Sequence, residues 1–182
     1  MTANEFNCAH QSLWSWVQRA EVCAELLSDI FHAGDGIAVS DIGCGDGKLE
    51  PLLRKLGLVR SYQGYDIRPQ SDKVIQFDVQ KDNLPKGSDV IVMLGVIEYL
   101  NELPSALAAL SARAPYLVLS HVIKQNDEYT PARRKELGWL NHLSDDELTA
   151  CLARANYDVI QKRMDKEDKN ILIACRSKNF IS

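Results

Sequence analysis

A glycine-rich turn directly after a buried strand is the feature of this sequence that most constrains its fold. Residues 37–42 have the apolar character of a short buried strand, and they run into Asp41-Ile-Gly-Cys-Gly-Asp-Gly47. The glycines let the backbone turn tightly and approach a ligand without hindrance from a Cβ atom. The helix expected over 48–56 then presents free N–H groups and the positive end of its dipole to an anionic group. This arrangement predicts a ligand site at the carboxyl end of the strand.

Strands and helices alternate along the rest of the chain, which favours a parallel sheet with helices on both faces. The expected strands are 37–42, 61–66, 73–77, 89–94 and 116–120, the expected helices are 12–32, 48–56, 104–113 and 144–155, and a hairpin of 158–164 with 170–175 closes the chain. The hairpin adds an antiparallel strand. The predicted fold class is therefore α/β, a doubly wound and mostly parallel sheet with an antiparallel C-terminal strand.

Two local signals refine this prediction. Ser144 followed by Glu147 is typical of a capping box at the start of the late helix. The polar stretch 124–138 is too long for an ordinary connection, and we expect it to form a lid or a substrate loop.

Composition narrows the class of protein. The length of 182 residues fits one domain at about 150 residues per domain. A net charge of −4 argues against a nucleic-acid partner. The five cysteines form no CxxC pair, which favours reduced thiols in the cytoplasm. No apolar run approaches the ~20 residues of a membrane helix, and no signal peptide opens the chain, so we expect no membrane span.

The spacing of the glycines discriminates among cofactors. A dinucleotide fingerprint would need a third glycine at position 48, which is Lys48. A phosphate-binding P-loop would need Ser or Thr after Lys48, and Leu49 stands there. The glycine turn considered alone is also compatible with a simple tight turn.

The turn resembles that of the class I S-adenosylmethionine-dependent methyltransferases, and the resemblance extends from about residue 37 to residue 175. Three further matches follow in order, namely Gly64-Tyr-Asp66, Phe77-Asp-Val79 and Asp89-Val-Ile-Val-Met-Leu-Gly-Val-Ile-Glu-Tyr-Leu100. The last is similar to the family's fourth strand and its V-(L/I)-E-H helix start, with Tyr99 in place of histidine. The resemblance implies a Rossmann-like seven-stranded sheet over 37–182, with residues 1–36 as an N-terminal helical extension.

The resemblance also implies the cofactor and the residues that bind it. The expected cofactor is S-adenosylmethionine, and its expected binding residues are Asp41, Gly43, Cys44, Gly45, Gly47, Asp66, Ile67, Asp78, Val79 and Leu94. Asp66 would accept hydrogen bonds from both ribose hydroxyls. Asp78 would accept the adenine amino group, the Val79 N–H would meet the ring, and Cys44 would be a small filler. Magnesium-dependent relatives carry carboxylates after the fourth and fifth strands, and this chain has none there, so no metal is expected.

The catalytic candidates are His121 and Tyr99. His121 follows the fifth expected strand, and its unperturbed pKa suits proton removal near neutrality. It would take the acceptor's proton, align its hydroxyl, or serve only as a structural histidine. Further candidates on the acceptor side are Tyr129, Trp139, His142 and the basic triplet 133–135. Trp139 would help to close the pocket or would simply cap the core. The triplet would meet a phosphate or carboxylate of the substrate or would form a solvated helix face.

The expected activity is metal-independent methyl transfer to oxygen or nitrogen of a small-molecule or glycan acceptor. Little chain remains outside the cofactor core, which predicts a shallow site, a homodimer that completes it, or a bulky acceptor. One alternative is a non-catalytic S-adenosylmethionine-binding subunit that serves a partner protein. A nicotinamide-dependent oxidoreductase is disfavoured by Lys48.

Overall fold

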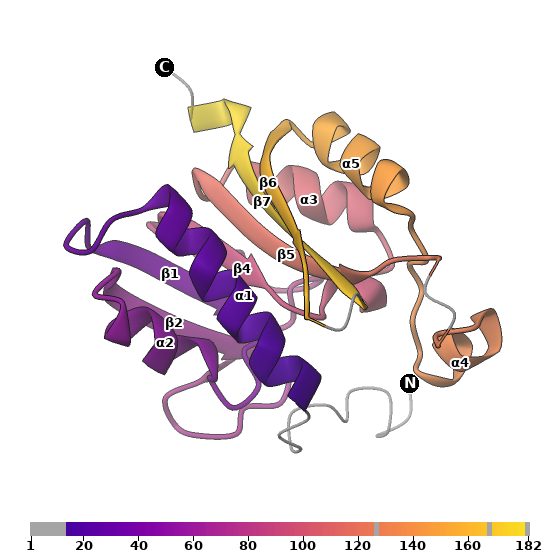
Figure 1. Ribbon diagram of the computed structural model, residues 1–182, viewed down its shortest axis with the longest axis horizontal. Coiled ribbons are helices and arrows are strands. Elements are labelled where there is room, and N and C mark those ends of the chain that lie inside the picture. Colours follow the sequence, from indigo (N-terminus) through magenta and orange to yellow (C-terminus); the bar gives the residue numbers. More distant parts are fainter. Residues whose placement is uncertain (1–13, 126–127, 167–168, 181–182) are drawn as a thin grey trace.

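Seven strands form one sheet in the computed structural model, which describes residues 14–125, 128–166 and 169–180 (Figure 1). The strands are β1 (Ile37–Ile42), β2 (Val59–Asp66), β3 (Ile75–Gln76), β4 (Val90–Met93), β5 (Tyr116–Val122), β6 (Tyr157–Met164) and β7 (Asn170–Ser177). Their order is β3-β2-β1-β4-β5-β7-β6. The first five strands run parallel, and β7 is antiparallel to both β5 and β6. The predicted fold class is confirmed.

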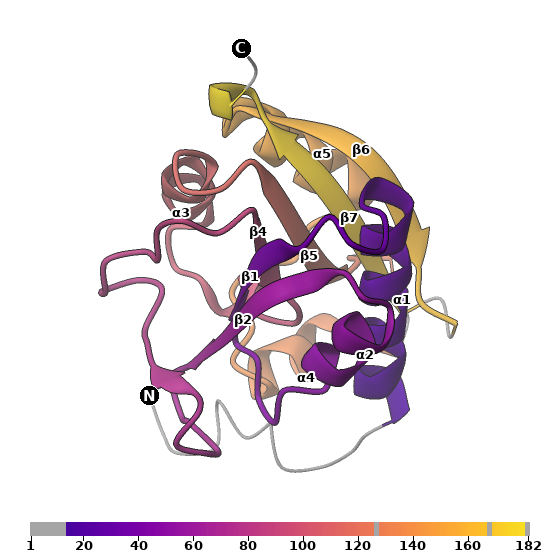
Figure 2. The ribbon, with the colours of Figure 1, turned by 90° about the vertical axis from the view of Figure 1, so that its left-hand side faces the viewer.

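Helices cover both faces of this sheet (Figure 2). They are α1 (Trp14–Ile30), α2 (Leu49–Lys55), α3 (Leu103–Ser111) and α5 (Asp145–Arg154), whereas α4 (Pro131–Glu136) lies beyond the end of β5 (Figure 1). Successive side chains of a strand point to opposite faces. Val90 and Val92 of β4 accordingly pack in the core beneath α1 and α2, whereas Ile91 and Met93 pack in the core beneath α3 and α5. The continuous apolar run of β4 is therefore explained by burial on both faces.

The first helix belongs to one of these two cores. Cys23, Leu26 and Leu27 of α1 are fully buried, and they pack with residues of α2, β1 and β4. The first two residues of the helix expected over 12–32 lie outside the described residues.

Two predicted segments differ from the structure. The strand expected over 73–77 shrinks to Ile75–Gln76, which pairs only with the end of β2 at the edge of the sheet. The stretch 124–138 carries a short helix, α4, whose N-terminus is capped by the Thr130 side chain. By contrast, the capping box of α5 is confirmed, because the Glu147 N–H donates to Ser144 Oγ at 3.1 Å and the Ser144 N–H donates to Glu147 Oε2 at 2.8 Å.

The parallel strands bring the predicted site residues to one edge of the sheet. β1, β2 and β4 lie side by side, and their carboxyl ends meet at that edge. In such sheets a ligand binds beyond the carboxyl ends, where neighbouring connections diverge to opposite faces. None of the helices in the described part of the chain is long and apolar enough to cross a membrane.

Candidate active site

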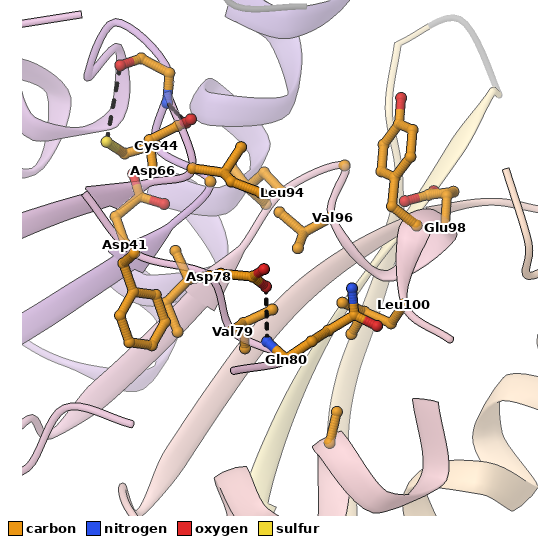
Figure 3. Close-up of a pocket in the computed structure, with 18 of the residues that line it drawn as sticks. Asp41, Cys44, Asp66, Asp78, Val79, Gln80, Leu94, Val96, Glu98 and Leu100 are labelled. Atoms are coloured by element: carbon orange, nitrogen blue, oxygen red, sulfur yellow. Dashed lines mark hydrogen bonds between the residues drawn. The ribbon is translucent and has the colours of Figure 1, made fainter. Parts of the chain in front are cut away.

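A cavity of about 960 Å³ opens at the carboxyl edge of β1, β2 and β4. All the expected cofactor-binding residues except Gly47 line it, namely Asp41, Gly43, Cys44, Gly45, Asp66, Ile67, Asp78, Val79 and Leu94. Figure 3 shows Asp41, Cys44 and Asp66 at one end, Glu98 at the other end, and Leu94 and Val96 between them. The cavity therefore has a glycine-loop end and a Glu98 end.

The glycine turn is held against β2 and the segment after β4. Gly43, Gly45 and Gly47 have φ values of +76°, +57° and +75°, a region that L side chains rarely adopt. The N–H groups of Gly43 and Cys44 both donate to the Tyr65 carbonyl, at 2.7 and 3.1 Å. A Cβ atom on Gly43 would lie 2.3 Å from Val96 Cγ2, so only glycine fits there. The turn is thus shaped by its contacts within the protein as well as by its approach to the cavity.

Asp41 is a buried carboxyl group at the end of β1. The Tyr62 hydroxyl donates a hydrogen bond to its Oδ2. Burial raises the pKa of Asp41 from 3.8 to about 7, the Tyr62 hydrogen bond opposes this rise, and the nearby charge of Asp66 adds to it. A positively charged group of a ligand would stabilise the ionised form of Asp41.

Asp66 ends β2 and connects it to the glycine turn. Its Oδ2 accepts the Gly45 N–H at 2.9 Å, and its Oδ1 accepts the Arg68 N–H at 2.8 Å. An ionised carboxylate offers about four acceptor positions, so each oxygen can still accept a hydroxyl of a ligand. These two backbone bonds fix the orientation in which Asp66 faces the cavity.

Asp78 and Val79 line the cavity after β3. Asp78 Oδ1 accepts the Gln80 N–H at 3.0 Å, and Oδ2 pairs with Lys81 Nζ at 2.7 Å. Burial by itself raises the pKa of Asp78, but the bonds from Lys81 and Gln80 outweigh it and bring the pKa below its ordinary value. Asp78 is therefore an anion that is oriented for a hydrogen-bond donor.

Cys44 is not suited to act as a nucleophile. Burial raises the pKa of the Cys44 thiol, and the neighbouring charges of Asp41 and Asp66 raise it further. A reactive cysteine needs the opposite shift, because the thiolate is the nucleophile.

The structure does not bring His121 to the cavity. Its side chain is fully buried and is absent from the cavity wall, whereas Tyr99 does line the cavity. The Leu143 N–H donates to His121 Nε2 at 3.2 Å, so Nδ1 carries the ring proton and donates it to Glu98 Oε1 at 3.2 Å. Both ring nitrogens are thereby used inside the protein, and this geometry leaves neither for an acceptor.

The basic triplet 133–135 divides between surface and core. Arg134 is 2% exposed, and its guanidinium donates to the carbonyls of Tyr129, Val122 and Ile123 at 2.6, 3.1 and 2.6 Å. The expectation that Arg134 either meets a substrate anion or lies on a solvated helix face is wrong, because its donors hold α4 to the end of β5. Arg133 is exposed and pairs with Glu136.

Arg19 is a buried cation that sequence reasoning missed. It lines the cavity at 9% exposure, and its guanidinium lies 5.2 Å from the centroid of the Trp16 ring. A Cβ atom on Gly95 would lie 2.4 Å from Arg19 Nη1, which places the guanidinium directly over the end of β4. Its Nε has no hydrogen-bond partner among the described residues. The only indication in the sequence was an arginine among the apolar residues of the first expected helix.

Glu98 is the second residue that was missed. It is 1% exposed, and its Oε1 accepts the Val122 N–H at 3.0 Å in addition to the His121 ring proton. Burial by itself raises the pKa of Glu98, but the hydrogen bond and electrostatic interaction with His121, together with the Val122 hydrogen bond, outweigh it and bring the pKa below its ordinary value. The resemblance had directed attention to Tyr99 beside it.

Two of the three remaining acceptor-side candidates lie at the Glu98 end of the cavity. Tyr129 and Trp139 line the cavity there and stack on each other, with ring centroids 5.0 Å apart. His142 lies outside the cavity wall, and burial is the largest cause that lowers its pKa. In the described part of the chain, no group of three or more His, Cys, Asp or Glu residues is placed to hold a metal ion.

Comparisons with known proteins agree with this geometry. A family model described as a methyltransferase domain matches residues 14–162. No relative was found among curated protein sequences.

Solved structures share the fold at low sequence identity. A complex between the Haloferax volcanii Trm112 methyltransferase activator and a putative methyltransferase matches with a TM-score of 0.69 and 13% identity, over 96% of this chain and 100% of that chain. Magnesium protoporphyrin IX methyltransferase from Synechocystis, with bound S-adenosylhomocysteine, matches with a TM-score of 0.65 and 14% identity, over 95% of this chain and 91% of that chain. The O-methyltransferase NcsB1 from neocarzinostatin biosynthesis, bound to S-adenosylhomocysteine and a dihydroxynaphthoic acid, matches with a TM-score of 0.64 and 15% identity, over 87% of this chain and 57% of that chain. With the family model covering most of the chain and the sheet order in place, this chain belongs to the class I S-adenosylmethionine-dependent methyltransferases.

Proposed function

We propose that this methyltransferase transfers the methyl group to an oxygen or a nitrogen of a small molecule in the cytoplasm, without a metal ion. The observation that carries the proposal is one continuous cavity with two chemically different ends. Its volume of about 960 Å³ lies at the upper end of the roughly 300–1,000 Å³ typical of small-molecule sites, which suits a cofactor together with an acceptor. In the described residues the cysteines at 23, 44, 151 and 175 are free thiols, as a reducing compartment requires.

The glycine-loop end suits the polar groups of S-adenosylmethionine. Asp66 would hold the ribose hydroxyls, and Asp78 with the Val79 N–H would hold the adenine. Arg19, a buried cation with an unpartnered Nε, would pair with the carboxylate of the amino-acid tail. Asp41 would accept the ammonium of the same tail, which favours its ionised form.

The protein's part in the reaction is alignment and exclusion of water. S-adenosylmethionine supplies a methyl group activated by a sulfonium. Leu94 and Val96 line the cavity between its two ends and limit access of water to the reacting atoms. Holding two reactants in line can itself provide a large share of the acceleration.

Binding and turnover measurements test this proposal. The purified chain is titrated with S-adenosylhomocysteine and, separately, with NADH, and we expect binding of the first alone. It is then incubated with S-adenosylmethionine carrying a labelled methyl group and a panel of hydroxyl- and amine-bearing metabolites. Label in a small-molecule product supports the proposal, whereas label that enters only protein or nucleic acid contradicts it.

A second candidate is a subunit that binds S-adenosylmethionine and works with a partner protein. It is favoured by the Haloferax structure, in which a putative methyltransferase of this fold is bound to the Trm112 activator. Activity of the purified chain without any other protein would exclude a requirement for a partner. Cofactor binding without turnover on any acceptor would favour the partner-dependent candidate.

A further inference from the structure

Apart from Arg19 Nε, three buried polar atoms of residues that line the cavity have no hydrogen-bond partner in the described part of the chain. They are Glu98 Oε2, Trp139 Nε1 and Asn170 Oδ1. Buried polar atoms in folded proteins are nearly always hydrogen-bonded, and a ligand supplies the partner where a cavity wall leaves them open. None of these residues belongs to the glycine-loop end, so the open positions point to the acceptor.

Glu98 Oε2 is the strongest of these open positions. The other oxygen, Oε1, already accepts two hydrogen bonds, from the Val122 N–H and from His121 Nδ1. These bonds fix the carboxylate and bring its pKa below the ordinary value, so Oε2 is an oriented anion. Arg19 also lines the cavity and interacts electrostatically with Glu98, yet the described residues contain no ion pair between them. An anionic oxygen in this setting calls for a hydrogen-bond donor.

The aromatic residues of the wall beside Glu98 are held in place by their neighbours. The Tyr129 and Trp139 rings stack with an interplanar angle of 29°. The Arg134 guanidinium lies 5.7 Å from the centroid of the Trp139 ring, and its hydrogen bonds to three carbonyls hold it in place. Aromatic walls of this kind favour flat, apolar ligands. Trp139 Nε1 adds a donor for an oxygen or nitrogen of that ligand.

We infer that the Glu98 end binds a flat acceptor whose nucleophilic O–H or N–H donates to Glu98 Oε2. Glu98 is then the residue that positions the acceptor, and His121 serves only to hold Glu98. This inference rests on the proposed function, since it assigns a substrate class and a positioning residue to the same cavity.

The inference is tested with two naphthalenes, of which only one carries an O–H donor. The protein is saturated with S-adenosylhomocysteine and dialysed to equilibrium against 2-naphthol or against 2-methoxynaphthalene. The ether has the same ring and oxygen but no O–H. We expect the wild-type protein to bind 2-naphthol at least about tenfold more tightly, as for a hydrogen bond to a charged acceptor.

Glu98→Gln tests the residue. The Val122 N–H and the His121 ring proton both need an acceptor, so the amide oxygen occupies the Oε1 position and the amide nitrogen the Oε2 position. Oε2 is thereby replaced by a donor with little change of shape. We expect the tenfold preference to disappear or reverse, while the affinity for S-adenosylhomocysteine stays within about twofold. Glu136→Gln, a matched control at an exposed residue of α4, should keep the preference.

The outcomes separate this inference from the proposed function. Wild-type protein that binds the two naphthalenes equally, or binds neither, contradicts the inference even if Glu98→Gln fails to fold. An unchanged preference in Glu98→Gln also contradicts it. Trp139→Phe provides a second variant, which should weaken both ligands and keep the ratio, because both carry the oxygen that Nε1 meets. Absence of S-adenosylhomocysteine binding to the wild type would instead contradict the proposed cofactor site.

Discussion

Asp41→Asn should change how the stability of the ligand-free protein depends on pH. Asp41 is 3% exposed, and burial raises its pKa from 3.8 to about 7. Asparagine keeps the shape and can still accept the Tyr62 hydroxyl, but it carries no charge at any pH. The comparison of the two proteins therefore isolates the ionisation of this one carboxyl group, because the other titrating groups cancel.

The sign follows from the raised pKa. Between about pH 4 and about pH 7, folded Asp41 holds a proton that the unfolded chain has released. The free energy of unfolding therefore falls as the pH rises through this window, and the loss is complete above it. At about 1.4 kcal/mol per pKa unit the full shift is worth about 4 kcal/mol, of which about 2–3 kcal/mol develops between about pH 5 and about pH 8.

Urea unfolding at these two pH values measures the effect. We expect Asp41→Asn to gain about 2–3 kcal/mol relative to the wild type between about pH 5 and about pH 8. Tyr62→Phe removes the hydrogen bond that lowers the pKa of Asp41. In this variant the free energy of unfolding should therefore continue to fall up to a higher pH than in the wild type. A difference between wild type and Asp41→Asn that does not vary with pH would refute the reasoning.

Cofactor binding gives an independent measurement of the same group. At about pH 7 roughly half of the Asp41 side chains are protonated, and pairing with an ammonium group would ionise them. Binding of S-adenosylhomocysteine should therefore release about half a proton more from the wild type than from Asp41→Asn. Calorimetry in buffers with different ionisation enthalpies measures this number, and equal release from both proteins would exclude Asp41 as the ammonium partner.

Four further substitutions test the site and its support. Asp66→Ala should weaken S-adenosylhomocysteine binding by roughly 2–4 kcal/mol in calorimetry, because charge-assisted bonds to the ribose are lost. Gly45→Val should lower cofactor affinity at least about tenfold, whereas Gly87→Val, also at positive φ but in open space, should lower stability alone. Arg134→Met should cost about 3 kcal/mol in urea unfolding and speed proteolysis of 124–138, because three carbonyls lose their donors. His121→Ala should cost about 2–4 kcal/mol of stability, since it opens a buried space and unpairs the Leu143 N–H, and should leave cofactor affinity nearly unchanged.

The glycine-loop end of the cavity was predictable because its residues are set by local sequence. Each expected residue stands in a turn or at the end of a strand, where the strand itself decides which edge it reaches. The glycines at 43, 45 and 47 all adopt positive φ, as the spacing of glycines in the sequence indicates. Parallel pairing then brings Asp41 and Asp66 together without further information.

The other end depends on contacts that sequence patterns do not contain. Arg133 and Arg134 look alike in the chain, yet only Arg134 meets the carbonyls at the end of β5 and becomes buried. In the sequence, Arg19 is simply one polar residue of an amphipathic helix. Only the packing of that helix on the sheet places its guanidinium over Gly95. Such placements are decided by how two helices dock on the sheet, which the periodicity of either helix leaves open.

Contacts between distant segments also decide the chemical roles of His121 and Glu98. Strand geometry carries His121 to the carboxyl edge of β5, as the sequence predicts, but the segment around Leu143 crosses that edge and covers the ring. Glu98 follows β4 in a short 3-10 turn, so its side chain reaches between the end of β5 and the cavity. The imidazole thereby binds one carboxylate oxygen, and the other oxygen is buried without a partner among the described residues. His121, which the sequence presents as a candidate base, therefore holds the Glu98 carboxylate in position in the folded chain.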